Sequence, residues 1–155
     1  MDEMASVEGA WEQVFAGLAA LRGAWPSQEW GYDRRFQSVM STITTADKQR
    51  ARAACDSLFK SVFDSAAIVG APPGPRALAD QYGGVRSGQL LLWNGEAGKP
   101  GAFGLWWPWG DGQSVSLRVG LHDVDLPKTR YPKLRDVFSV PQAPPGHGWS
   151  ERSHS

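Results

Sequence analysis

The sequence predicts an α+β fold, in which an N-terminal layer of three helices packs on a C-terminal three-stranded antiparallel meander and a short helix closes the chain. Apolar residues recur at steps of three and four over residues 4–69, which is typical of helices with one buried face. After Gly88 they alternate with polar residues, which is typical of strands with one buried face. A chain of 155 residues is long enough for one domain with its own core.

We expect this single domain to cover residues 1–140, with a helical half (4–69), a linker (70–76) and a sheet half (77–140). The linker "GAPPGPR" is rich in proline and glycine, which disfavour regular structure. Residues 141–155 have no periodicity, and we expect them to form a flexible tail.

Three apolar stripes define the helices expected in the first half. The first stripe lies on a helix over residues 4–23, and Pro26 and Ser27 then mark a break. The second stripe begins at Tyr32, and Gly70 ends the third. The stripes comprise Val7, Trp11, Val14, Phe15, Leu18, Leu21 and Trp25; Tyr32, Phe36, Val39, Met40 and Ile43; and Cys55, Leu58, Phe59, Val62, Phe63 and Ala66.

The second half contains three expected strands separated by glycine-containing turns. They cover residues 89–93, 102–109 and 114–122, with the turn sequences "NGEAGKPG" and "GDG" between them. The preceding segment "PRALADQYGG" has room for two helical turns, and residues 131–138 for the closing helix. A three-stranded sheet with one apolar face needs a cover, which the helices of the first half would supply.

The charge balance and the single cysteine limit the classes of partner. Sixteen Lys and Arg residues balance sixteen Asp and Glu residues, so the chain shows no sign of nucleic-acid binding. The acidic N-terminus lacks the pattern of a signal peptide, and no stretch approaches the roughly 18 apolar residues of a membrane span. Cys55 has no cysteine to pair with. We therefore expect a soluble, bacterial-type cytoplasmic protein with no cofactor, no membrane partner and no nucleic-acid partner.

The tryptophan-rich stretch "AFGLWWPWGDG" (102–112) admits two pairings with the following strand. A two-residue turn at 111–112 would place Trp107 opposite Ser116 and Trp106 opposite Leu117, which leaves a broad aromatic face for a ligand. A three-residue loop at 110–112 would instead place Trp107 opposite Val115. We favour the second pairing, because it collects the large apolar side chains on one buried face and leaves only Trp106 outside.

The favoured pairing defines a candidate contact surface. Trp106 would lie diagonal to Arg118, in position for a cation–π contact. The residues from 128 to 135 add a modest basic run, which is either a solvated face or a site for an acidic protein partner. The residues expected to contact a partner are Trp106, Arg118, Asp111, Ser116, Lys128 and Arg130.

The chain contains few residue patterns that carry chemistry. His122, Asp123 and Asp125 form the one polar cluster with ligand-like composition, and we interpret it as a strand-end turn because hard metal ions need more oxygen ligands. Cys55 lies on an apolar stripe, where a buried structural thiol is expected. Nucleophile-elbow and phosphate-loop motifs do not occur. We therefore predict no catalytic residue and no metal site.

These observations lead to three functional hypotheses. The first is a non-catalytic protein-interaction module, such as an adaptor, a chaperone-like partner or a toxin-neutralising immunity protein, whose partner is encoded nearby. The second is a small-molecule or glycan-binding domain that uses the tryptophan-rich strand. The third is a small enzyme with a site around His122, Asp123 and Asp125.

Overall fold

The computed structural model describes residues 3–95, 99–123 and 130–140, with residues 3–6 as backbone only. The helices are α1 (Glu3–Ala24), α2 (Lys48–Leu58), α3 (Pro73–Gln81) and α4 (Arg130–Val137), with short 3-10 turns at Thr45–Asp47 and Ala67–Gly70. The strands are β1 (Gly31–Asp33), β2 (Ser38–Thr44), β3 (Ser61–Phe63), β4 (Leu90–Asn94), β5 (Gly101–Pro108) and β6 (Ser114–His122). In this part of the chain the strands form one antiparallel, six-stranded sheet in the order β1-β2-β6-β5-β4-β3.

The predicted architecture is therefore wrong in two respects: the sheet has six strands instead of three, and the helices do not form an N-terminal layer of three. The second expected helix is the hairpin of β1 and β2. Tyr32 lies opposite Val39 in this hairpin, so apolar residues that fit a helical spacing in the sequence meet across two strands. Along β2 the buried Val39 and Ile43 lie on one face with Ser41, which is the two-residue period of a strand.

The third expected helix is also shorter than its apolar stripe. Helix α2 ends at Leu58, where the backbone of Phe59 becomes extended, and β3 follows at Ser61–Phe63. The remaining expected elements are present: α1, β4, β5, β6 and α4 lie within two residues of their predicted bounds. Helix α3 supplies the two expected turns but begins at Pro73, inside the expected linker, because proline is accepted in the first turn of a helix.

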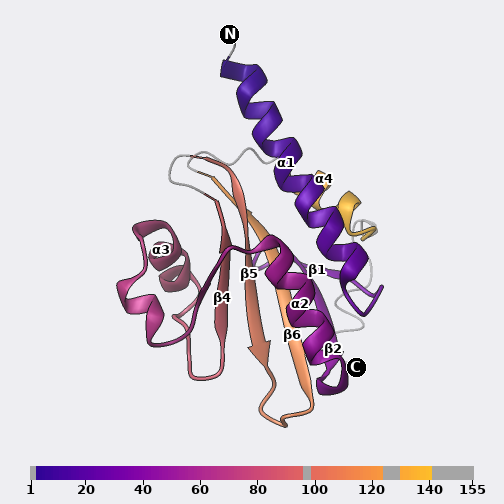
Figure 1. Ribbon diagram of the computed structural model, residues 1–155, viewed down its shortest axis with the longest axis vertical. Helices are drawn as coiled ribbons and strands as arrows, with labels where there is room; N and C mark the ends of the chain where they lie inside the picture. Colours follow the sequence, from indigo (N-terminus) through magenta and orange to yellow (C-terminus); the bar gives the residue numbers. More distant parts are fainter. Residues whose placement is uncertain (1–2, 96–98, 124–129, 141–155) are drawn as a thin grey trace.

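Helices cover both faces of the sheet, but to different extents (Figure 1). We call the face that packs on α1, α2 and α4 the helical face, and the face that packs on α3 the groove face. Among the described helices, none is long and apolar enough to cross a membrane. The helical face holds the larger core, to which α1 contributes Trp11, Phe15, Leu18 and Leu21, and β6 contributes Val115, Leu117, Val119 and Leu121.

On the helical face, tryptophan side chains contact a neighbouring helix and the sheet. The guanidinium of Arg130 lies 4.9 Å from the ring centroid of Trp11, and its Nη2 forms an ion pair with Glu8 at 3.0 Å. The indole Nε1 of Trp25 donates a hydrogen bond to the buried Oγ of Ser41 at 2.9 Å. This bond satisfies a hydroxyl that would be costly to bury unpaired.

Candidate partner-binding groove

The pairing of β5 with β6 corrects the register that we favoured from the sequence. Trp107 lies opposite Ser116 and Trp106 opposite Leu117, as in the alternative pairing. Trp109 N–H donates to the carbonyl of Ser114 at 2.8 Å, so residues 110–113 form the connecting loop. Our assumption that the large apolar side chains share a single buried face was wrong, because α3 buries part of the groove face as well.

Trp106 consequently lies inside the molecule. Its side chain is 3% exposed and packs in the core of the helical face. The prediction that Trp106 is left outside is wrong, since the observed register turns it toward Leu117 and the helices. The cation–π contact that we expected at Trp106 is made by its neighbour Trp107, whose ring centroid lies 4.6 Å from the Arg118 guanidinium.

Arg118 is held on the groove face by groups of this chain. Its guanidinium lies 5.2 Å from the Phe36 ring, on the turn between β1 and β2, and its Nε donates to Asp33 at 3.3 Å. Burial raises the pKa of Asp33, but hydrogen bonds from Arg35 and Arg118 outweigh it, so this pKa lies below its ordinary value. Arg118 therefore braces the β1–β2 turn against β6.

The other expected contact residues are scattered. Ser116 is buried on the groove face, where its Oγ accepts a hydrogen bond from the Trp109 indole at 2.8 Å. Asp111 is exposed in the β5–β6 loop and accepts the Gln113 N–H at 2.8 Å. Arg130 lies on α4, over the helical face, and Lys128 lies outside the described residues. The fold thus brings Ser116 and Arg118 onto one face and does not assemble a site from the whole set.

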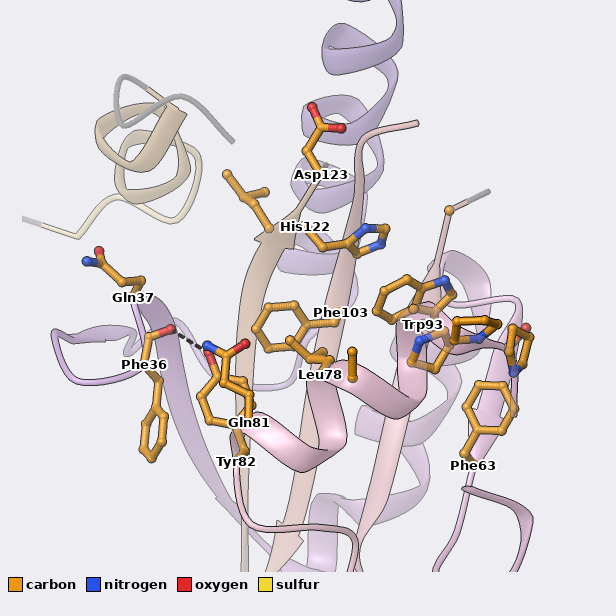
Figure 2. Close-up of a pocket in the computed structure, with 18 of the residues that line it drawn as sticks. Phe36, Gln37, Phe63, Leu78, Gln81, Tyr82, Trp93, Phe103, His122 and Asp123 are labelled. Atoms are coloured by element: carbon orange, nitrogen blue, oxygen red, sulfur yellow. Dashed lines mark hydrogen bonds between the residues drawn. The ribbon is translucent and has the colours of Figure 1, made fainter. Parts of the chain in front are cut away.

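A groove of about 650 Å³ lies between α3 and the groove face (Figure 2). The sequence does not predict this groove, because its spacing favours a helix where the β1–β2 turn lies and a linker where α3 begins. The groove is lined by residues of the sheet, of α3 and of the β1–β2 turn. They are Ser61, Phe63, Trp93, Phe103 and His122 on the strands, Ala77, Leu78, Gln81 and Tyr82 on and directly after α3, and Phe36 and Gln37 in the turn.

The first turn of α3 sits close to the sheet because of a glycine. A Cβ at Gly74 would lie 3.1 Å from the Cζ2 atom of the Trp93 ring, which is tighter than ordinary van der Waals contact. The bare Gly74 backbone therefore packs against the indole of Trp93. Pro72, Pro73 and Pro75, the neighbours of Gly74 in the chain, also line the groove.

His122 and Trp93 form a stacked pair in the groove. Their ring centroids are 3.8 Å apart with an interplanar angle of 10°, and His122 Nε2 lies 2.9 Å from the Asn94 carbonyl. Gly95 and Gly101 make room for the imidazole, since a Cβ on either would collide with it. Burial lowers the pKa of His122, so the ring is neutral at pH 7 and its Nε2–H donates to Asn94.

Tyr82 and Phe36 contact each other where the β1–β2 turn borders the groove. The Tyr82 hydroxyl donates to the Phe36 carbonyl at 3.3 Å, and the two rings meet edge to face at 4.9 Å (Figure 2). Burial raises the pKa of Tyr82, which keeps the hydroxyl protonated as a donor. This contact ties α3 to the β1–β2 turn across the groove face.

A second hollow, of about 590 Å³, lies on the other side of β3 and β4, next to α1. It is lined by Ala10, Gln13 and Val14 of α1, and by Lys60. The two hollows share the lining residues Ser61, Trp93, Gly95 and Lys99, so they adjoin at the end of β4.

The remaining sequence candidates have defined positions. Cys55 is fully buried in α2, and burial raises the pKa of its thiol to about 12, which confirms the expected buried thiol. Asp123 lies beside His122 at the groove, whereas Asp125 lies outside the described residues. Among the residues that the structure describes, no three His, Cys, Asp or Glu side chains come together as metal ligands would.

Trp109 is the one tryptophan with a largely exposed side chain among those described, at 51%. Its indole is nevertheless oriented, because Nε1 donates to Ser116 and Ser116 in turn shares a hydrogen bond of 2.9 Å with Thr42. The exposed ring lies outside the groove, beyond Trp107 along β5.

Comparisons with known proteins found no significant match to a protein-family model, to a curated protein or to a solved structure.

Proposed function

We propose that this chain is a non-catalytic, cytoplasmic interaction module that binds an extended segment of another protein in the groove between α3 and the sheet. The observation that carries this proposal is that two hollows adjoin at the end of β4, where they share lining residues. A small ligand fills one concave pocket, whereas an extended segment can follow a groove from one face of a sheet to the other.

The chemistry of the lining supports a peptide as the occupant. Trp93 and His122 offer stacked aromatic surface, and Gln37 and Gln81 offer amide groups that can pair with a peptide backbone. Aromatic side chains in hollows of this kind are the usual anchors of protein interfaces. A single buried cysteine suits the reducing conditions of the cytoplasm.

A matched pair of alanine substitutions tests the proposal. Ala77 on α3 is exposed and lines the groove, whereas Ala53 on α2 is exposed on the other side of the sheet and does not. Random 12-residue peptides on phage are selected against the full chain, and their affinities are measured by fluorescence anisotropy. We expect Ala77→Arg to weaken binding by about tenfold or more and Ala53→Arg to change it by less than about twofold.

The opposite results would overturn the proposal. If no peptide is enriched, or if the enriched peptides bind Ala77→Arg as tightly as the wild type, the groove is not a peptide site. Circular dichroism of both variants checks that the fold is intact, and arginine is a good helix former at either position.

A glycan-binding function remains the second candidate, because the exposed Trp109 ring is held by Ser116 beside the hydroxyl of Thr42. A fixed indole face next to hydroxyl groups suits the stacking of a sugar ring. Titration with neutral glucan and chitin oligosaccharides, followed by tryptophan fluorescence, tests it. A saturable change that Trp109→Ala abolishes would support this candidate, and an unchanged spectrum would exclude it for these sugars.

A further inference from the structure

Within the residues that the structure describes, strand β3 is an edge of the sheet and has one side without a neighbouring strand. Its pairing with β4 places Ser61 opposite Trp93, Val62 opposite Leu92 and Phe63 opposite Leu91. An edge strand presents unpaired backbone N–H and C=O groups, which are a template for another strand.

In an antiparallel sheet, hydrogen-bonded pairs alternate with non-bonded pairs along each strand. This alternation identifies which residues of β5 direct their backbone N–H and C=O groups toward β6 and which direct them toward β4. The bond from Trp109 N–H to the Ser114 carbonyl shows that these opposite residues form a bonded pair of β5 with β6. Bonded pairs recur at every second residue, so odd-numbered β5 residues bond β6 and even-numbered ones bond β4. Gly104, which lies opposite Leu92, therefore bonds β4.

The same alternation carries over to β3. Because Leu92 uses its backbone groups on β5, the residues on either side of it, Leu91 and Trp93, use theirs on β3. Their partners Phe63 and Ser61 are thereby occupied. Val62 is left with both its N–H and its C=O pointing away from the sheet.

Hollows flank this edge on both faces. The side chains of Ser61 and Phe63 point to the groove face and line the first hollow, together with Trp93. Lys60 has the opposite parity, points to the helical face and lines the second hollow beside α1. A strand added next to β3 would place its successive side chains alternately into these two hollows.

We infer that the partner segment binds as an added strand on the outer edge of β3, hydrogen-bonded to the N–H and C=O of Val62. The inference rests on the proposed function and specifies how the segment is held. Side chains on the groove side are apolar or aromatic, because they meet Trp93 and Phe63. Side chains on the helical side are acidic, because the exposed Lys60 ammonium stands at that hollow.

Two substitutions at Val62 isolate the backbone contact. Val62→Pro removes the outward N–H, which makes no bond to β4, and proline is tolerated at such edge positions. It also replaces a partly buried side chain that packs against the core of the helical face. Val62→Thr keeps the N–H and a β-branched side chain. With the peptides selected above, we expect Val62→Pro to weaken binding by about tenfold and Val62→Thr to change it by less than about twofold.

Charge reversal at Lys60 tests the chemistry of the segment. Lys60→Glu should lower the affinity for peptides that carry an acidic residue. Changing that acidic residue of the peptide to lysine should restore binding to the Lys60→Glu variant.

Peptides with N-methylated amides provide a test that does not depend on the fold of any variant. Methylation of the amides that face β3 should abolish binding, and methylation of the amides that face away should not.

The outcomes separate this inference from the proposed function. If Ala77→Arg abolishes binding while Val62→Pro, alternate N-methylation and Lys60→Glu have no effect, the groove binds peptides but not by strand addition, and the inference is wrong. If the wild type sediments as a dimer and Val62→Pro as a monomer, the edge of β3 pairs with a second copy, which also overturns it.

Discussion

The two faces of the sheet differ in how completely helices cover them. On the helical face, α1, α2 and α4 bury every large side chain of β6. On the groove face, the nine-residue α3 packs mainly on β4 and β5, and Trp93, Trp107 and Tyr82 remain only partly buried. A fully covered face stabilises the fold, whereas an incompletely covered one offers apolar surface to a partner.

The adjacent residues Trp106 and Trp107 provide the sharpest test of this difference, because they point to opposite faces. We expect Trp106→Ala to lower the free energy of unfolding by about 3–5 kcal/mol, since it removes a buried ring from the larger core. Trp107→Ala should cost about 1–2 kcal/mol, from partial burial and the lost contact with Arg118. Urea denaturation measures both, and equal losses would contradict the distinction between the faces.

Gly120 tests how tightly the floor of the groove is packed. A Cβ at this position would lie 2.5 Å from the Cζ atom of Phe103, so the ring must move to accept it. We expect Gly120→Ala to lower the free energy of unfolding by about 1–3 kcal/mol. Gly110, in the β5–β6 loop, has open space around its Cβ position, so Gly110→Ala should change stability by less than about 0.5 kcal/mol. A neutral Gly120→Ala would show that Phe103 is free to move.

The free energy of unfolding should depend on pH because of His122 on the groove face. Burial lowers its pKa in the folded state below the ordinary value of 6.5. The neutral ring therefore contributes stability that is complete above pH 6.5 and is lost as the pH falls through the lowered pKa, at no more than about 1.4 kcal/mol per pH unit. Urea denaturation between pH 8 and pH 4 should show this decline in the wild type and a smaller one in His122→Gln. Parallel curves would exclude His122 as the source.

Secondary structure was predictable where one element buries one continuous face. The stripe from Trp11 to Leu21 has the period of a helix because a single side of α1 meets the sheet. The alternation from Val115 to Leu121 is equally regular, because β6 lies in the middle of the sheet and turns the same side to the helices. Buried Cys55 was predictable for the same reason, from its place on the stripe of α2.

The hairpin of β1 and β2 was not predictable from periodicity. Tyr32 and Val39 are seven residues apart, as on one face of a helix, but here they are opposite each other on two strands. Spacing alone does not distinguish two turns of helix from a tight hairpin. A stronger weight on the alternating, β-branched run "SVMSTIT" would have favoured the strand.

The helical period of α1, the strand period of β6 and the burial of Cys55 can be read from the sequence, because local spacing reflects the face that each element buries. The register of the tryptophans and the position of the groove depend instead on contacts between segments that are far apart in the chain. This register is favourable because α3 and the turn at Phe36 cover part of the groove face. Trp106 can therefore pack in the core of the helical face while its neighbour Trp107 packs on the groove face. The groove is assembled from residues far apart in the chain, such as Phe36, Tyr82 and His122, whose proximity no local pattern encodes.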